Sequence, residues 1–242
     1  MDNFGLLGKN IDYSFSKSYF EKKFAQDDIK ATYENFDIAD LSELKNILKK
    51  KTHLKGLNVT IPYKEEIINH LDEVDAAAQE IGAVNTIKID NGKLIGYNTD
   101  VYGFTKSIFS LIENHHHKAL ILGSGGASKA IQNALESMGF KTQIVSRNKG
   151  ENKLTYEDLN EEIIKDHQVI VNCTPLGTYP NIENHPPIPY TFLTHEHLLY
   201  DLVYNPPITT FLALGKEHHT KIFNGQKMLE FQAEKAWEIW HQ

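Results

Sequence analysis

The sequence predicts an α/β fold in two domains, with a doubly wound parallel sheet in the second domain. From residue 118 onward, apolar strand-like segments alternate strictly with helix-like segments, a pattern typical of a parallel sheet covered by helices. A glycine-rich loop opens this region, and a hairpin signal lies before it. We expect one domain at 1–100 plus 226–242 and the other at 101–225, because an apolar stripe near the C-terminus should pack on the first domain.

The composition indicates a globular protein and argues against nucleic acid as a partner. The 242 residues include 25 Lys and Arg against 32 Asp and Glu, a net charge of -7, so no global positive field is available to hold phosphate backbones. Hydrophobic residues make up 40% and charged residues 24%, which excludes collagen-like, coiled-coil and largely disordered classes.

Cysteine usage and hydropathy bear on the compartment. Cys173 is the single cysteine, so neither an intrachain disulfide nor a cysteine-cluster metal site can form. The N-terminus lacks the features of a signal peptide, and no segment approaches 18 uninterrupted apolar residues. We therefore expect a cytoplasmic protein without a membrane segment or a metal.

The first hundred residues alternate short strands with helices. A strand is expected near 4–7 and helices at about 18–25, where Ser18 and Glu21 have capping-box spacing, and at 41–50. Residues 55–61 read as a strand that buries Leu57, Val59 and Ile61, and Pro62 then begins a helix.

Asn91-Gly92 is a two-residue hairpin signal, because both positions tolerate positive φ. Strands are expected on either side, at 83–89 and 93–97, and counting back from the turn pairs Asn85 with Asn98. In that register Asn98 and Asp100 share a face with Asn85, a convergent polar set of the kind that polyhydroxylated ligands need.

The second region contains a regular series of elements. A short histidine run, 115–117, precedes it and is expected to be a solvated loop. The expected strands are 119–122, 142–146, 169–173 and 198–203, and the expected helices are one after the glycine loop, 156–165, 210–216 and 228–240.

The loop Gly123-Ser-Gly-Gly-Ala-Ser128 lies between a strand and a helix, where its backbone N–H groups could approach a pyrophosphate at the helix N-terminus. Ser128 replaces the third glycine of the dinucleotide fingerprint, and a plain strand-to-helix turn is the alternative. About 20 residues on, the next strand ends in Ser146-Arg147-Asn148. Arginine suits a 2′-phosphate and no acid is present here, so NADP is expected rather than NAD, and a methyltransferase is disfavoured; a solvated arginine is the alternative.

Three polar positions of the first domain have both a structural and a functional interpretation. Ser14 and Ser16 would point to one side of an extended loop, although serines before a helix are usually caps. Lys64 would fall in the first turn of its helix, where the macrodipole disfavours a cation and lowers its pKa toward acid/base range. Asp100 is either a helix N-cap or a partner for Lys64.

A series of short motifs together resembles the shikimate dehydrogenase family in order and spacing over essentially the whole chain. They are Asn58-Val-Thr-Ile-Pro-Tyr-Lys64, Gly82-Ala-Val-Asn-Thr86, Asn98-Thr-Asp100, Gly123-Ser-Gly-Gly-Ala127, Asn172-Cys-Thr-Pro-Leu-Gly177, Asp201-Leu-Val-Tyr-Asn-Pro206 and Asn224-Gly-Gln-Lys-Met-Leu229 with Gln232-Ala233. The resemblance implies an N-terminal substrate domain, a Rossmann-like NADP domain, and NADPH-dependent reduction of 3-dehydroshikimate to shikimate in aromatic amino-acid (chorismate) biosynthesis.

The same resemblance implies roles for individual residues. Lys64 and Asp100 would form the catalytic pair, with Lys64 as general acid/base and Asp100 orienting it. Substrate hydroxyls and carboxylate would be held by Ser14, Ser16, Thr60, Asn85, Asp100, Tyr204 and Gln232. NADP(H) would be held by Gly123, Ser124, Gly125, Gly126 and Ala127 at the pyrophosphate, Ser146, Arg147 and Asn148 at the ribose phosphate, and Thr174, Leu202 and Gly225 at the nicotinamide; Cys173 is expected to serve packing.

The chain departs from the family pattern near its start and at the cofactor arginine. Tyr13 stands where the family commonly has histidine and Lys17 where it has proline, while Tyr19 and Phe20 replace a His-Asn pair. Ser146 and Asn148 replace an asparagine and a threonine, so fewer phosphate contacts could relax the NADP preference.

Other interpretations stay open at this point. A quinate or quinate/shikimate dehydrogenase shares the scaffold and both catalytic residues. A catalytically silent NADP-binding regulator would have lost its acid/base group, whereas Lys64 and Asp100 are both present. A methyltransferase rests on the glycine loop alone, and a monomer and a homodimer fit the sequence equally.

Overall fold

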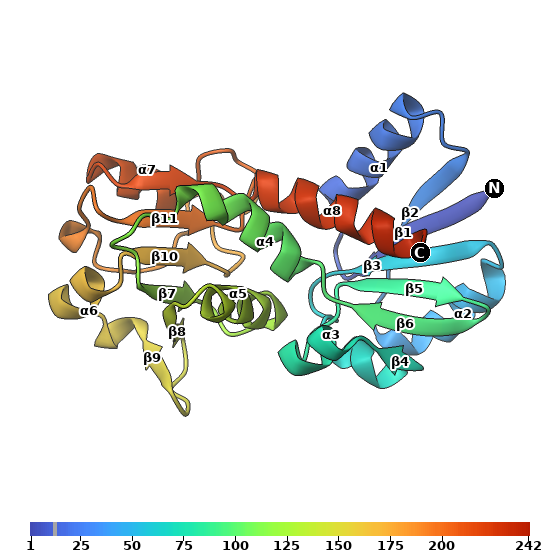
Figure 1. The fold of residues 1–242 in the computed structure, drawn as a ribbon, viewed down its shortest axis with the longest axis horizontal. Coiled ribbons are helices and arrows are strands. Elements are labelled where there is room, and N and C mark those ends of the chain that lie inside the picture. Colours follow the sequence, from blue (N-terminus) through green and yellow to red (C-terminus); the bar gives the residue numbers. More distant parts are fainter. Residues whose placement is uncertain (12–13) are drawn as a thin grey trace. The chain divides into compact units, whose positions relative to one another are not determined.

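The computed structural model describes residues 1–11 and 14–242 and divides into two compact units (Figure 1). Unit 1 comprises 1–99 and 233–242, and unit 2 comprises 100–232. The chain therefore returns to unit 1 within its last helix rather than before it. No helix among the described residues is long and apolar enough to cross a membrane.

Unit 1 is built on a mixed six-stranded sheet. Its order is β2-β1-β3-β5-β6-β4, with β1 parallel to β2 and β3, and with β5 antiparallel to β3 and β6. The elements are β1 (Asp2–Gly8), α1 (Phe15–Gln26), β2 (Ala31–Asp37), η1 (Leu41–Glu43), α2 (Leu44–Lys50), β3 (Leu54–Val59), η2 (Glu66–His70), β4 (Glu73–Val74), α3 (Ala76–Ile81), β5 (Thr86–Asp90) and β6 (Lys93–Tyr97).

The last helix, α8 (Gln226–Trp240), ends in unit 1 as the apolar stripe predicted. The Trp240 ring stacks on Phe4 with centroids 4.8 Å apart, and its Nε1 donates to the Ile87 carbonyl at 3.0 Å. A Cβ on Gly56 would lie 2.2 Å from Trp240 Nε1, so the glycine in β3 leaves room for the indole. These contacts bury the end of α8 against the centre of the sheet.

Unit 2 has the all-parallel sheet that the alternating pattern predicted. Its order is β12-β11-β10-β7-β8-β9, the doubly wound arrangement in which the strand order reverses between β7 and β10. The elements are α4 (Asp100–Ile108), η3 (Phe109–Leu111), β7 (Lys118–Leu122), α5 (Gly126–Ser137), β8 (Lys141–Ser146), β9 (Lys153–Thr155), η4 (Tyr156–Asp158), α6 (Glu161–Asp166), β10 (Val169–Asn172), η5 (Tyr190–Phe192), β11 (Leu198–Asp201), α7 (Thr210–Glu217) and β12 (Lys221–Phe223).

Both faces of this sheet are buried. Alternate strand residues such as Ile121 and Val171 pack in one cluster with Phe104 of α4, and their neighbours Leu120 and Ile170 pack in a second cluster. Two covered faces are what a strand of uninterrupted apolar residues requires. The predicted fold class is confirmed.

Three local expectations in unit 1 are wrong. The first helix begins at Phe15 rather than near Ser18, whose hydroxyl donates to the Phe15 carbonyl, so no capping box forms. Ile61 is 62% exposed and lies beyond β3, which ends at Val59. The segment after Pro62 is a series of turns leading into η2, and no α-helix begins there.

The histidine run is also not a plain solvated loop, because His116 is only 4% exposed. Its Nδ1 accepts the Glu113 N–H at 3.0 Å, so that nitrogen carries no proton and Nε2, 3.1 Å from the Glu196 carbonyl, is the donor. His197 repeats the arrangement, with Nδ1 accepting from Thr194 N–H and Nε2 3.0 Å from the Ile164 carbonyl. His116 thus joins the loops that lead into β7 and β11, and His197 joins the second of these loops to α6.

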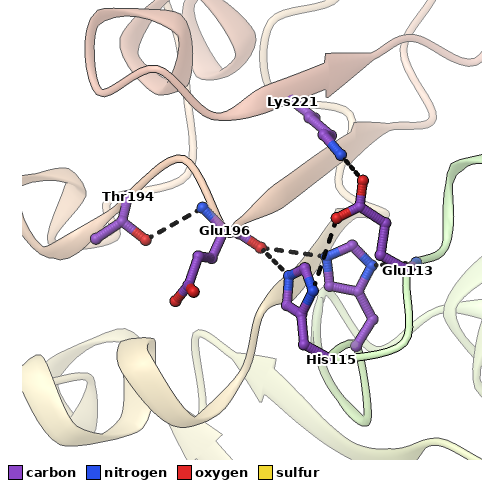
Figure 2. Close-up of polar contacts among 6 residues, drawn as sticks. Glu113, His115, Thr194, Glu196 and Lys221 are labelled. Carbon is purple, nitrogen blue, oxygen red and sulfur yellow. Dashed lines mark hydrogen bonds and ion pairs between the residues drawn. The ribbon is translucent and has the colours of Figure 1, made fainter.

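Charged side chains lie beside the two loops, 113–116 and 194–197, that these histidines belong to (Figure 2). Lys221 pairs with Glu113, and His115 Nε2 lies 3.1 Å from the same Glu196 carbonyl. Burial lowers the pKa of His116, the hydrogen bond to Glu196 opposes that shift, and the nearby histidines 115, 197 and 117 add to it. The buried ring is therefore neutral around pH 7.

We expect His116 to make unfolding easier at mildly acid pH. Since its folded pKa lies below the unfolded value of about 6.5, the unfolded chain takes up the proton first and stability falls as the pH drops through 6.5. His116→Asn keeps an acceptor near Glu113 but removes the donor to Glu196. We predict that the free energy of unfolding in urea at pH 7.5 is about 1 kcal/mol lower for this variant than for the wild type. Between pH 7.5 and 5.5, the free energy of unfolding should fall less in the variant than in the wild type.

His53→Asn, at an exposed position of unit 1, is the control and should leave both the stability at pH 7.5 and its pH dependence unchanged. An identical pH dependence in the wild type and His116→Asn would contradict this account of the buried ring.

Candidate active site

The strand order in unit 2 reverses between β7 and β10, and doubly wound sheets bind ligands at the carboxyl ends of the strands beside such a reversal. Gly123 follows β7 at φ +115°, a conformation that favours glycine, and a Cβ there would lie 3.3 Å from the Cys173 backbone. Glycine is therefore required for the turn and for close approach to the loop after β10.

The start of α5 fits a dinucleotide pyrophosphate. Gly125 caps the helix without a side chain, so no side-chain oxygen occupies the first helical N–H groups, and nothing lies within 4 Å of the Cβ it lacks. At the third glycine position Ser128 is 1% exposed, and its Oγ has no hydrogen-bond partner among the described residues. This small side chain still allows α5 to lie close to Gly123.

Arg147 follows β8 and is exposed beside a hollow of about 390 Å³. The lining residues are Arg147, Asn148, Lys149, Thr155, Tyr156 and Glu157. Burial raises the pKa of Tyr156 to about 12, while Arg147 lowers it slightly, so the phenol stays neutral. Ser146 donates to the Asn148 carbonyl at 2.6 Å and so closes the turn that presents the arginine.

Four residues of this hollow were not anticipated from the sequence, and two of them, Lys149 and Glu157, are charged. Lys149 adds a second cation, which its position two residues after Arg147 could have suggested. Glu157 adds a carboxylate to the hollow. The expectation that no acid lies near the arginine is therefore wrong for the folded protein, although no acid adjoins Arg147 in the sequence. It comes from η4, beyond the next strand, and local spacing gives no signal for it.

The loops after β10 and β11 carry Thr174 and Leu202. Thr174 N–H and Oγ1 both donate to Asn172 Oδ1, at 3.0 and 2.6 Å. A Cβ on Gly225 would lie 2.2 Å from the Leu202 carbonyl oxygen, so the loop before α8 packs against Leu202. Cys173 is half-buried and packs on the core, one residue past the end of β10.

In unit 1, Ser14 and Ser16 are not in an extended loop as expected. Ser14 is the N-cap of α1, and its Oγ accepts from the Ser16 N–H at 3.3 Å. Ser16 lies in the first turn and is buried near Tyr33, to whose hydroxyl it is hydrogen-bonded. The capping interpretation therefore holds for Ser14.

A buried hydrogen-bond chain crosses the sheet of unit 1. Tyr33 donates to Asn58 Oδ1 at 2.8 Å, Asn58 Nδ2 donates to Thr86 Oγ1 at 3.3 Å, and Thr86 donates to Asn85 Oδ1 at 3.1 Å. Asn85 Nδ2 then donates to Thr99 at 3.0 Å, and Thr99 N–H returns a bond to Asn85 Oδ1 at 2.7 Å. The chain holds the Asn85 carboxamide in one orientation.

The hairpin register that paired Asn85 with Asn98 is confirmed, since Thr86 pairs with Tyr97. Asn98 Nδ2 donates to the Ala83 carbonyl at 2.9 Å, and Thr99, which the expected polar set did not include, bonds Asn85. β6 and its ladder end at Tyr97, so strict alternation is not required of the residues that follow.

Lys64 lies half-buried in the turns after β3, so the helix-dipole argument for it fails. Its carbonyl accepts the Val84 N–H at 2.7 Å, and this bond draws the chain away from a helical course. Thr60 N–H donates to the Leu7 carbonyl, and the Asn85 carbonyl accepts from Val59 N–H. Lys64, Thr60 and Asn85 thus lie on adjoining segments of unit 1.

Asp100 and Gln232 both belong to unit 2. Asp100 is the buried first residue of α4, and a Cβ on Gly103, one turn later, would lie 2.6 Å from the Met228 carbonyl and 2.9 Å from Gln232 Cβ. The glycine lets α8 approach α4 closely at this turn. Tyr204 lies half-buried in the loop after β11.

Of the residues that depart from the family pattern, Tyr13 lies outside the described residues. Lys17 is exposed, whereas Tyr19 donates to Glu234 of α8 and Phe20 stacks on Tyr33 with centroids 4.7 Å apart. These aromatic residues therefore pack the interior of unit 1. No group of three acidic, histidine or cysteine side chains within the described ranges is placed to hold a metal ion.

Known proteins share this chain's sequence and fold. Residues 6–87 match the model of the shikimate dehydrogenase substrate binding domain. A shikimate dehydrogenase (NADP(+)) from Clostridium botulinum is 39% identical over 98% of this chain and 95% of its own length. The chain belongs to the shikimate dehydrogenase family.

Solved structures show the same architecture. Shikimate 5-dehydrogenase from Thermus thermophilus, in complex with NADP(H) and shikimate, is 30% identical with a TM-score of 0.87 and covers 99% of this chain and 93% of its own. Quinate dehydrogenase from Corynebacterium glutamicum, in complex with NAD, is 27% identical with the same TM-score and coverage. Both substrate types therefore occur on this fold.

The glycine loop leads to a stability prediction. Gly123→Ala forces a side chain into φ +115° against the Cys173 backbone, which should cost about 1–3 kcal/mol of unfolding free energy in urea titrations. Gly125→Ala, at φ -90° with open space around it, is the control and should cost less than about 1 kcal/mol. Equal losses in the two variants would contradict the assigned backbone geometry.

Proposed function

We propose that this chain is an NADP-dependent shikimate dehydrogenase that interconverts 3-dehydroshikimate and shikimate. The observation that carries the proposal is the glycine loop at the strand reversal of unit 2, followed at the end of β8 by Arg147. Family membership supplies the substrate, because a relative and a solved structure of similar sequence are named for shikimate. Aromatic amino-acid biosynthesis is then the metabolic setting.

Unit 2 would hold the cofactor. Its pyrophosphate would accept from the N–H groups of the loop Gly123, Ser124, Gly125, Gly126 and Ala127. The 2′-phosphate would lie beside Arg147 and Lys149, with Ser146 and Asn148 shaping the turn, and Thr174, Leu202 and Gly225 would lie on the nicotinamide side. When bound, the reduced cofactor supplies the hydride that reaches the carbonyl carbon.

The substrate's hydroxyls and carboxylate would be held by hydrogen bonds, because a polyhydroxylated ring presents many donors and acceptors. The proposed partners are Ser14, Ser16, Thr60 and Asn85 of unit 1 and Asp100, Tyr204 and Gln232 of unit 2. The fixed Asn85 carboxamide supports this role, since a preset orientation lowers the cost of ordering on binding.

Lys64 is the proposed general acid/base, with Asp100 as the group that orients it. Reduction places negative charge on the carbonyl oxygen, so Lys64 Nζ donates a proton there and takes it back during oxidation of shikimate. Asp100 accepts hydrogen bonds from the ammonium and from a substrate hydroxyl. Two hydrogen bonds support this pairing: Val84 N–H donates to the Lys64 carbonyl, and the N–H of Thr99, the residue before Asp100, donates to Asn85 Oδ1.

A second candidate is a dehydrogenase with relaxed cofactor or substrate choice. Two observations favour it: Glu157 lines the hollow beside Arg147 and would repel a 2′-phosphate, and the Ser146 hydroxyl is used within the turn. An NAD-bound quinate dehydrogenase also has this fold. Comparable turnover of quinate or NAD+ would favour this candidate.

The cytoplasm is the proposed compartment. Cys173 is the only cysteine, and a chain without disulfides suits a reducing environment.

The proposal predicts rapid NADP+ reduction on shikimate at alkaline pH and a strong dependence on Lys64. In Lys64→Ala, kcat should fall by about 10²–10⁴-fold with the KM for shikimate within about threefold, because the proton transfer is lost and the binding residues remain. Lys55→Ala, an exposed lysine of the same unit, is the control. NADP+ binding without turnover in the wild type would indicate the silent regulator instead.

Arg147 should decide the choice of cofactor. Arg147→Ala removes the permanent charge beside the 2′-phosphate, so the KM for NADP+ should rise at least about tenfold while that for NAD+ stays within about twofold. Lys141→Ala, at the opposite end of β8, should change neither constant. Equal effects on both cofactors would contradict the role of Arg147.

A further inference from the structure

Asp201 is a buried carboxylate that the proposed reaction does not use. It ends β11 and has no exposed surface. Its Oδ1 accepts from Asn172 Nδ2 at 2.9 Å and from Val203 N–H at 3.0 Å, and its Oδ2 accepts from Thr209 Oγ1 at 2.5 Å. A buried charge is costly unless donors satisfy it, and here three donors do so.

The carboxylate decides how the Asn172 side chain is oriented. A carboxylate only accepts hydrogen bonds, so it must face the Nδ2 end of the carboxamide. The Oδ1 end then points to Thr174, where it accepts from both the backbone N–H and the hydroxyl. Thr174 Oγ1 in turn accepts from the Leu176 N–H at 3.3 Å, so the loop after β10 has one arrangement.

The same carboxylate fixes the loop after β11. Its hydrogen bond from the Val203 N–H fixes the residue next to Leu202. Thr209, which also donates to Asp201, is the N-cap of α7 and accepts from the Leu212 N–H at 3.4 Å. Gly225 N–H donates to the Val203 carbonyl at 3.3 Å, which joins the loop before α8 to this arrangement. One buried group therefore connects the three segments that carry Thr174, Leu202 and Gly225.

We infer that Asp201 is a positioning residue for the cofactor, holding the nicotinamide-side loops of unit 2 in the arrangement that binds NADP(H). This inference rests on the proposed function, because that function assigns the three segments to the nicotinamide. Asp201 touches neither substrate nor cofactor in this role and acts through Asn172 and Thr209.

Protonation should release the arrangement. Burial raises the pKa of Asp201 to about 6, against the hydrogen bonds from Thr209, Val203 and Asn172, which lower it. Tyr190 of η5 faces it, and burial together with Asp201 raises the pKa of that phenol, so it stays neutral. The groups that β10 and α7 contribute are the uncharged Asn172 and Thr209. Below pH 6 the neutral carboxyl group no longer dictates the Asn172 orientation.

The test compares NADP+ binding by Asp201→Asn and wild-type protein in calorimetric titrations from pH 5 to pH 8. The variant Kd should be about tenfold higher at pH 8, and the ratio of the two Kd values should approach one at pH 5, where the wild-type group is also neutral. The ratio cancels the titration of the ligand's own phosphate.

Asp166→Asn, an exposed aspartate of the same unit, is the control and should give a ratio of one throughout. Two results would overturn the inference. One is a Kd for NADP+ that is the same in Asp201→Asn and the wild type at pH 8. The other is a raised ratio of the two Kd values that does not change with pH, which would indicate a merely structural role.

Thr209→Val and Thr209→Ser provide a second test if Asp201→Asn does not fold. Valine removes the donor to Asp201 and should raise the Kd for NADP+, whereas serine should restore it; equal values for the two variants would also overturn the inference. A wild-type protein that oxidises shikimate with neither NADP+ nor NAD+ would refute the proposed function, and unchanged NADP+ binding in the variants of an active enzyme would refute this inference alone.

Discussion

The parallel direction of the strands in unit 2 is the constraint on which the candidate site depends. Because every strand runs the same way, the carboxyl ends of β7, β8, β10 and β11 meet at one edge, and each releases its loop there. The glycine turn, the arginine turn and the Asn172–Asp201 pair lie at the same edge for that reason. The reversal of strand order between β7 and β10 then places the Gly123 turn where doubly wound sheets bind ligands.

Unit 1 holds its polar residues by a different means. Its sheet is mixed, and a line of buried side chains from Tyr33 to Thr99 satisfies its own hydrogen bonds across three strands. A fully satisfied network of this kind is rigid, because each member would lose its partner if another turned. In both units a buried polar network thus fixes side chains that the proposed function uses.

The sequence allowed the fold class, the hairpin register and the strands β7, β8, β10 and β11 of unit 2 to be predicted, because each depends on local periodicity or turn chemistry, but not the short strands β9 and β12. It did not allow β2 to be predicted, since that strand is polar and its buried Tyr33 is satisfied by Asn58, 25 residues away. The turns after Pro62 depend on a bond from Val84 to Lys64, and Glu157 reaches the arginine hollow from beyond the next strand. These three errors involve partners distant in the chain, which periodicity does not report.

A crystal structure of the protein with NADP+ and shikimate would test the central claim most directly. The account predicts pyrophosphate oxygens within hydrogen-bond distance of the N–H groups at the start of α5, and the 2′-phosphate against Arg147. Shikimate should contact Lys64 and Asn85. A cofactor bound away from the carboxyl edge of unit 2, or a 2′-phosphate that avoids Arg147, would contradict it.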